Sequence, residues 1–305
     1  MRTKYKFGLV LVCILALGAG ITWWLLQANI AVLQPKGIIA EQQRNLLVFA
    51  TILSLLVVLP VYAMTFYIAR TYRESNQKAE YKPDWDHSNK LEAIWWGLPI
   101  LLISILAVIA WNSSHSLDPS KPLSSTKKPV RVQVIALEWK WLFIYPEQGI
   151  ASINTLHIPA NTPINFEITA DAPMNSLWIP ELGGQIYAMA GMNTKLHLMA
   201  NQTGNFNGSS ANLSGEGFSG MKFITHAVSP GDFTDWAASI ASASPEYLSQ
   251  EAYQGLTVPT KNILPSYYGR IDRSVYAKVI KKYMPLQDPA ESDMMLQNHL
   301  LKAVN

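Results

Sequence analysis

Two long apolar stretches stand out in the first part of the chain. Residues 46–68 contain no charged side chain, and as a helix rising ~1.5 Å per residue they would reach about 34 Å, enough to cross the hydrocarbon core of a bilayer. Residues 91–111 are also apolar apart from Glu92. The pattern predicts a hairpin of two membrane-spanning helices. Two buried core helices of a soluble protein are the alternative.

The segments around these stretches predict how the hairpin is oriented. Residues 1–28 begin with three basic side chains followed by an apolar run, which is typical of a signal peptide or an uncleaved N-terminal anchor. The hairpin region then covers residues 29–112. Its connecting loop is rich in basic side chains, which predicts a cytoplasmic loop and an exported C-terminal part: Arg70, Arg73, Lys78, Lys82 and Lys90.

Beyond residue 112 the pattern changes from apolar runs to short alternating segments. Stretches such as VRVQVIAL and INFEITA alternate with the period of two that half-buried strands require, and Pro and Gly clusters separate them. About seven such segments predict a linker and β-sandwich over residues 113–232. Residues 233–305 show helical periodicity and many aromatic residues, which predicts a smaller appended helical region.

Composition agrees with a protein that is part membrane and part globular. The chain of 305 residues is 49% hydrophobic and 15% charged. Cys13 is its single cysteine, so an internal disulfide framework is excluded. The net charge is only +3 and no basic run exceeds two residues, which argues against nucleic acid as a partner. The predicted fold class is a membrane-anchored mixed protein: a transmembrane helical hairpin, an extracytoplasmic β-sandwich and a short helical tail.

Four sequence blocks occur in order along this architecture: SNKLEAIWWGLPILLI, EWKWLFIYPEQGIASINTLHIPANTP, MNSLWIPELGGQIYAMAGM and GFSGMKF. Together they closely resemble subunit II of the haem-copper respiratory oxidases, in the bo-type ubiquinol oxidase branch, over roughly residues 30–290. The resemblance implies that the sandwich is cupredoxin-like. Bo-type relatives commonly carry a lipidated Cys after the leader, and its position falls on Ala28, which cannot carry that lipid. Whether the leader is cleaved stays open.

In the copper-bearing cytochrome c oxidases of this family, the sandwich holds copper through a Cys-x-Glu-x-Cys-x3-His-x2-Met loop and one upstream His. Matching Met221 to the terminal Met assigns the remaining ligand positions to residues without a thiolate or an imidazole: Asn175, Ser210, Asn212, Ser214 and Phe218. A copper centre that changes oxidation state requires those soft donors. The resemblance therefore implies that this chain binds no metal and carries no redox centre.

The missing copper ligands indicate the electron donor of the complex. Family members without them oxidise a quinol in the membrane, and the electrons pass directly to subunit I. The resemblance implies a proton-pumping ubiquinol oxidase that reduces oxygen to water, with haem and copper in subunit I and further small membrane subunits as partners. It also implies the bacterial inner membrane, with the C-terminal domain in the periplasm. The choice between ubiquinol and menaquinol stays open.

Glu92 is the residue of this chain for which the resemblance implies a role in proton transfer. The family's Glu at the start of the second span lies at the cytoplasmic mouth of a proton-input channel into subunit I. An ionisable group at a membrane boundary is a functional candidate in general. The spacing of Asn89 and Glu92 also fits the N-cap and N3 positions of a capping box, which is the structural alternative.

The EWKWLFIY segment is a second candidate feature. Strand alternation would place Trp139, Trp141, Phe143 and Tyr145 on one face. The resemblance implies that Trp139 and Trp141 belong to an aromatic docking surface, and packing in the sandwich core or against subunit I is the alternative. Two other function classes also remain: a copper-dependent cytochrome c oxidase subunit II, and a membrane-anchored assembly or binding module.

Overall fold

The computed structural model describes residues 16, 18–20, 22–24, 27, 28, 30–77 and 86–284. The chain divides into two compact units. One, the hairpin unit, comprises Met1–Pro122 with Pro180–Gly184, and the other, the sandwich unit, comprises Leu123–Ile179 with Gln185–Asn305. Most of the predicted leader, residues 1–28, lies outside the described residues.

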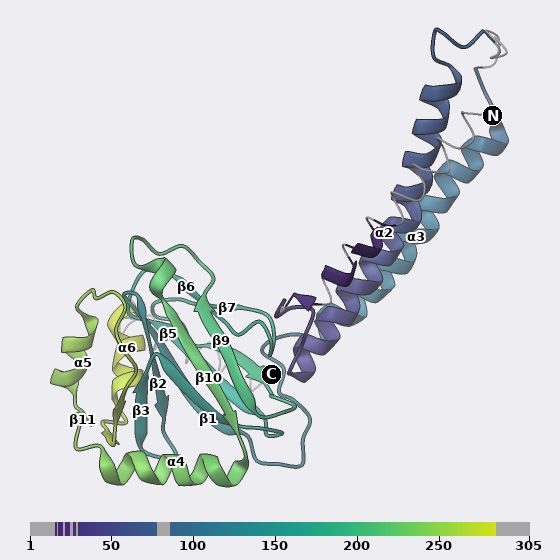
Figure 1. The fold of residues 1–305 in the computed structure, drawn as a ribbon. Coiled ribbons are helices and arrows are strands. Elements are labelled where there is room, and N and C mark those ends of the chain that lie inside the picture. The colour runs from purple at the N-terminus through teal and green to yellow at the C-terminus, as the bar shows by residue number, and fades with distance from the viewer. Residues whose placement is uncertain are drawn as a thin grey trace, which may run out of the picture. The chain divides into compact units, whose positions relative to one another are not determined.

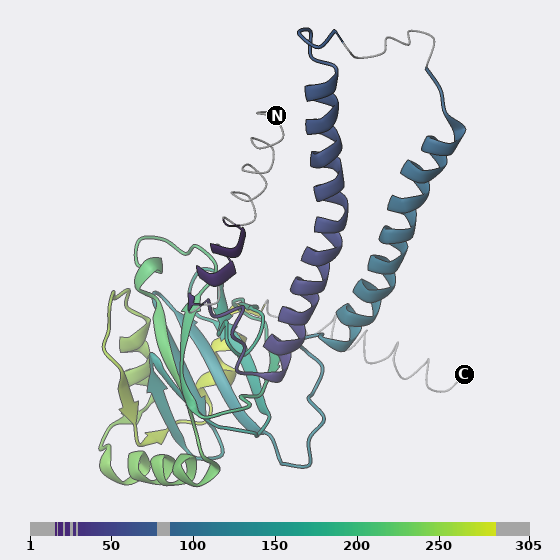
Figure 2. The ribbon, with the colours of Figure 1, turned by 45° about the vertical axis from the view of Figure 1, so that its right-hand side comes forward.

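The hairpin unit contains two long helices, α2 (Ile38–Thr71) and α3 (Asn89–Ser116), which Figure 2 shows as two extended rods. Both are long and apolar enough to cross a membrane, in agreement with the two predicted spans. Hydroxyl groups on α2 donate to carbonyl groups one turn earlier, as Thr51 does to Leu47 at 2.8 Å. Such bonds satisfy the hydroxyl within the helix, which an apolar environment requires.

Both helices extend beyond the predicted spans. Helix α3 continues to Ser116 instead of ending at Trp111, although residues 112–116 are polar. No proline lies between Trp111 and Pro119, and Ser114 Oγ donates to the carbonyl of Trp111 at 3.0 Å. The predicted start of the linker at residue 113 is therefore wrong, because these polar residues form the last turn of the helix.

The sandwich unit contains the two stacked sheets shown in Figure 1, which confirms the predicted β-sandwich. One sheet has the strand order β12-β3-β2-β1-β5-β8 and the other β4-β10-β9-β6-β7. The strands up to residue 228 are β1 (Val130–Leu137), β2 (Lys140–Tyr145), β3 (Ile150–Ile153), β4 (Thr155–Pro159), β5 (Ile164–Ala170), β6 (Asn175–Trp178), β7 (Ile186–Ala188), β8 (Thr194–Leu198), β9 (Gly204–Ser210) and β10 (Lys222–Val228). These ten strands are shorter and more numerous than the seven expected.

Aromatic side chains fill the space between the two sheets. The rings of Trp141 and Phe143 on β2 lie 6.0 and 5.0 Å from the ring of Phe223 on β10, measured between centroids. Gly208 on β9 is the register partner of Phe223, and a Cβ atom there would lie 2.1 Å from the Phe223 ring. Any larger residue at Gly208 would therefore displace the central aromatic contact.

The C-terminal region contains helices, as predicted for residues 233–305, and it packs on the sheets as part of the sandwich unit. Its elements are α4 (Pro230–Ala243), β11 (Tyr247–Leu248), α5 (Gln250–Thr257), β12 (Ser266–Tyr268), β13 (Arg270–Ile271) and α6 (Val275–Tyr283). Strand β12 pairs with β3 and extends the larger sheet. Helices α5 and α6 lie against strands β1–β3, as Figure 1 shows, because Ile135, Leu137 and Ile144 need apolar cover on that face.

A buried carboxylate attaches both helices to the sheet. Asp171 follows β5 and accepts hydrogen bonds from the hydroxyl groups of Tyr253 on α5 and Tyr283 on α6, at 2.7 and 2.6 Å. The ammonium group of Lys282 donates to the same carboxylate at 2.7 Å. Burial favours the neutral acid, but the hydrogen bonds from Lys282, Tyr283 and Tyr253 outweigh it and hold the pKa of Asp171 below its ordinary value.

We predict that Asp171→Asn lowers the free energy of unfolding of the sandwich unit by about 2 kcal/mol at pH 7, because three donors lose their charged acceptor. The pKa of Asp171 is lower in the folded state than in the unfolded chain, so the carboxylate stabilises the fold above about pH 4 and this contribution is lost as the pH falls further. The difference between wild type and variant should therefore shrink below pH 4. Urea unfolding of the purified chain in detergent, followed by near-ultraviolet circular dichroism, measures it.

A matched control is Glu216→Gln. Glu216 also accepts a hydrogen bond from a lysine, Lys261, at 2.7 Å, but this pair lies on the surface. Solvent screens exposed ion pairs, so the control should unfold at the urea concentration of the wild type. If Asp171→Asn behaved like the control, the carboxylate would not hold the C-terminal helices.

Candidate functional site

The residues assigned to the former copper positions come from three strands and one loop that meet in the structure. Asn175 begins β6, Ser210 ends β9, and Met221 directly precedes β10. Ser210 Oγ donates to Asn175 Oδ1 at 2.7 Å, and the Ser210 amide donates to the carbonyl of Met221 at 3.0 Å. All three side chains are buried. These positions therefore form one connected, polar network beside a buried thioether.

The other assigned positions lie in the loop between β9 and β10. Asn212 Nδ2 donates to the carbonyl of Met174 at 2.8 Å, and Phe218 opens the 3-10 helix η1 (Phe218–Gly220). The hydroxyl group of Ser214 is buried and has no hydrogen-bond partner in the part of the chain that the structure describes. The five non-thioether positions thus offer two amides, two hydroxyls and one phenyl ring.

This donor set does not fit a copper centre of the family's type. Copper that cycles between two oxidation states requires thiolate and imidazole ligands, and Met221 alone is a weak one. Within the described ranges, no group of three or more His, Cys, Asp and Glu side chains is arranged to hold a metal ion. The loop must therefore be shaped by other contacts.

An indole ring provides those contacts. Trp139 lies in the turn between β1 and β2 with φ of 64°, a left-handed backbone conformation that is uncommon for residues other than glycine. Its Nε1 donates to the carbonyl of Ser214 at 3.1 Å. A Cβ atom at Gly217 would lie 2.2 Å from the indole, so the loop can pass over the ring only with glycine at this position. The Lys261 ammonium group lies 5.4 Å from the ring centroid.

The predicted aromatic docking surface is wrong for Trp141. Trp141, Phe143 and Tyr145 do share one face of β2, but this face points into the sandwich and all three side chains are fully buried. Trp139 is not part of the strand, because its left-handed backbone belongs to the turn. It is half-buried beneath the loop. The alternation of aromatic residues therefore indicated the core and not a surface.

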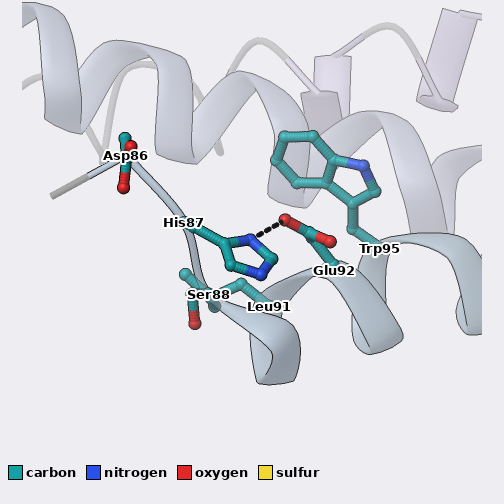
Figure 3. Close-up of a pocket in the computed structure, with 6 residues that line it drawn as sticks. All are labelled: Asp86, His87, Ser88, Leu91, Glu92 and Trp95. Carbon is teal, nitrogen blue, oxygen red and sulfur yellow. Dashed lines mark hydrogen bonds and ion pairs between the residues drawn. The ribbon is translucent and has the colours of Figure 1, made fainter.

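A second candidate site lies at the start of α3 in the hairpin unit. A cavity of about 250 Å³ is lined by Asp86, His87, Ser88, Leu91, Glu92 and Trp95, and Figure 3 shows these side chains. Glu92 Oε1 lies 2.6 Å from Nδ1 of His87, and both side chains are about half exposed, at 51% and 58%. The carboxylate and the imidazole therefore form a hydrogen-bonded pair that water can reach.

The capping box, which was the structural alternative for Glu92, is not present. The N-cap of α3 is Ser88, so Asn89 is already the first helical residue and Glu92 is one position beyond N3. The Glu92 amide donates to the carbonyl of Ser88 at 3.0 Å, while its carboxylate turns to His87. The Glu92 side chain thus lines the cavity and does not cap the helix. Sequence reasoning missed His87, although its place directly before the N-cap was a usable signal.

The structure also brings two other histidines together. His157 on β4 and His226 on β10 are register partners whose rings stack with centroids 4.5 Å apart, and Trp236 of α4 stacks on the other side of His157 at 4.1 Å. Burial, together with the neighbouring His226 ring, lowers the pKa of His157 to about 4. His157 is therefore uncharged at neutral pH and serves as part of the contact that holds α4 on the sheet.

Comparison with known proteins places these features in a family. Residues 147–228 match the family model "Cytochrome C oxidase subunit II, periplasmic domain". The chain is 50% identical over 255 residues to the "Cytochrome bo(3) ubiquinol oxidase subunit 2" of Pseudomonas aeruginosa, covering 84% of this chain and 77% of that protein. It is 49% identical over 254 residues to the "Ubiquinol oxidase subunit 2" of Acetobacter aceti, covering 83% and 82%.

Among solved structures, the periplasmic domain of subunit II of cytochrome oxidase from Bradyrhizobium japonicum is similar to this chain with a TM-score of 0.35 and 21% identity, covering 38% of this chain and 96% of that one. The relatives from Pseudomonas and Acetobacter match across both the hairpin and the sandwich. The chain therefore belongs to the cytochrome bo(3) ubiquinol oxidase subunit 2 family.

Proposed function

We propose that this chain is the non-redox subunit II of a proton-pumping terminal oxidase that oxidises ubiquinol and reduces oxygen to water. The observation that carries the proposal is sequence identity of 50% over 84% of the chain to a protein named as a ubiquinol oxidase subunit 2. The donor set at the former copper positions supports the same function. Without thiolates and imidazoles the loop cannot relay electrons, so electrons have to reach the haem in subunit I directly from quinol.

The proposal includes the partners and the location of the chain. Haem and copper belong to subunit I, and further small membrane subunits complete the oxidase in the bacterial inner membrane. The basic residues Arg70 and Arg73 at the end of α2 and Lys90 at the start of α3 favour a cytoplasmic connection between the helices. The sandwich unit then lies in the periplasm, where it supports subunit I.

Glu92 is the residue of this chain to which we assign a role in proton uptake. With the connection between the helices in the cytoplasm, the first turn of α3 lies at the cytoplasmic boundary of the membrane. The half-exposed Glu92 carboxylate there can exchange protons with water in its cavity. Subunit I would receive these protons for the reduction of oxygen.

The assignment to a quinol oxidase predicts what co-purifies with the chain. A chain carrying an affinity tag, isolated in mild detergent from native membranes, should bring with it a multispan subunit containing haem, and the complex should consume oxygen with a soluble ubiquinol analogue. Oxygen consumption with reduced cytochrome c in place of the quinol would favour the copper-dependent alternative. Isolation of the chain alone would favour an assembly or binding module.

The donor set also predicts that the purified chain, incubated with excess copper and then desalted, holds far less than one copper ion per chain by elemental analysis. A matched control restores the donors with Asn175→His, Ser210→Cys, Ser214→Cys and Phe218→His, which together with Met221 should bind copper and produce visible absorption. Stoichiometric copper on the wild-type chain would contradict the proposed absence of a metal centre.

Proton uptake through Glu92 predicts that Glu92→Gln slows quinol-driven oxygen consumption several-fold, because an amide cannot carry the proton. Glu92→Asp, which keeps a titratable group, should retain more activity. Steady-state oxygen uptake at equal haem content measures both variants. If the carboxylate only stabilises the helix start, its loss costs no more than about 1 kcal/mol and turnover stays at the wild-type value.

A further inference from the structure

The side chain that contacts the Glu92 carboxylate is itself a proton-exchanging group. His87 lies in the segment before α3, and its Nδ1 atom is 2.6 Å from Glu92 Oε1, as the dashed line in Figure 3 marks. No other side-chain hydrogen bond or ion pair to the Glu92 carboxylate occurs among the described residues 30–77 and 86–284. Any proton that reaches Glu92 through a side chain of this described part of the chain therefore passes through His87.

We propose that His87 collects protons for Glu92: its imidazole takes a proton from cytoplasmic water and passes it to the carboxylate. This inference rests on the proposed role of Glu92 in proton uptake. In the transfer, the Nδ1–H bond of the imidazolium breaks and its electron pair stays on the ring. A new O–H bond forms at Oε1, so a charged pair becomes a neutral pair, and water in the cavity then returns a proton to the ring.

The chemistry of the two groups suits uptake of the proton by His87 and its transfer to Glu92. Histidine is the side chain whose charge ordinarily changes near neutral pH, so an imidazole can both accept a proton from water and release it during turnover. The contact between Nδ1 and Oε1 is within the range of direct proton transfer, and no intervening water is needed. Chains of Asp, Glu and His side chains are the usual proton relays of membrane pumps.

The cavity around the pair has both apolar and polar lining. Leu91 and Trp95 of α3 line it together with Asp86 and His87 from the segment before the helix. Among the described residues, the other charged groups near the pair are Asp86, which lines the cavity, and Lys90, which is exposed in the first turn of α3. Neither of these two forms a hydrogen bond or an ion pair with the Glu92 carboxylate. His87 is thus the titratable group of the described cavity lining that is hydrogen-bonded to Glu92.

The test uses His87→Asn in the assembled oxidase at equal haem content. The amide nitrogen of asparagine can take the place of Nδ1 and still donate to Glu92, but it cannot relay a proton. Quinol-driven oxygen uptake should fall by about twofold or more, with a larger deficit at pH 8 than at pH 6, where protons are more abundant. Free imidazole in the assay medium should restore the rate.

The control is His115→Asn, which makes the same substitution in the last turn of the same helix. His115 Nδ1 lies 2.7 Å from the carbonyl of Trp111, and within the described residues no hydrogen bond joins the ring to a carboxylate, so this variant should match the wild type at every pH and show no response to imidazole. If the His87–Glu92 pair only stabilised the start of α3, His87→Asn should also turn over like the wild type, because asparagine keeps the hydrogen bond to Glu92.

The outcomes separate this inference from the role of Glu92. Wild-type turnover in Glu92→Gln would contradict proton uptake through Glu92 altogether. A slow Glu92→Gln together with a normal His87→Asn, or a slow His87→Asn that imidazole does not restore, would overturn the role of His87 alone. If both residues act in one relay, the double variant should be no slower than Glu92→Gln.

Discussion

Apolar side chains on both faces of strands β1–β3 have to be removed from water, and this requirement organises the sandwich unit. One face packs on the second sheet through Phe223, and the other is covered by α5 and α6. Hydrophobic burial is not directional, so it does not by itself fix where the two helices lie. The Asp171 carboxylate adds that direction, since it binds one side chain of α5 and two of α6 at the end of β5.

The same unit keeps a metal-site loop in shape by ordinary packing. Hydrogen bonds join Ser210 to Asn175 and to Met221, and the indole of Trp139 fills the space below Gly217. Together these contacts hold the positions that the sequence resemblance assigned to former copper ligands. In the proposed oxidase the sandwich therefore contributes structure, and the chemistry of this chain is limited to proton transfer in the hairpin unit.

The sequence was sufficient to predict the two long helices, the sandwich and the convergence of the loop with Asn175. Long uncharged runs and strict alternation are strong signals. A long uncharged run is what a helix inside a membrane requires, and alternation is what a strand with one buried face requires. The helical C-terminal region was predicted too, but the face on which it packs was not. Its cover of strands β1–β3 depends on contacts such as Tyr253 with Asp171, which are separated by 82 residues and leave no periodic signal. Trp141 was misassigned for a related reason, since alternation identifies a face but does not say what covers it.

The two candidate sites differ in how far they could be derived from local sequence. The N-cap of α3 depends on backbone conformation at Ser88 and Asn89, and a shift of one residue turned Glu92 from a capping residue into the partner of His87. Either Ser or Asn is an acceptable N-cap, so propensity could not decide between them. Whether Glu92 can reach His87, five residues earlier, depends on which residue is the N-cap.

The hydrogen bond between Ser210 and Asn175 makes it difficult to replace either residue alone. Replacing either residue alone by a copper ligand would leave its buried partner without a hydrogen bond, at a cost of about 1–3 kcal/mol. No new contact would compensate until both residues changed together. Single substitutions at these two positions would thus each be selected against, so the pair can change in evolution only as a unit.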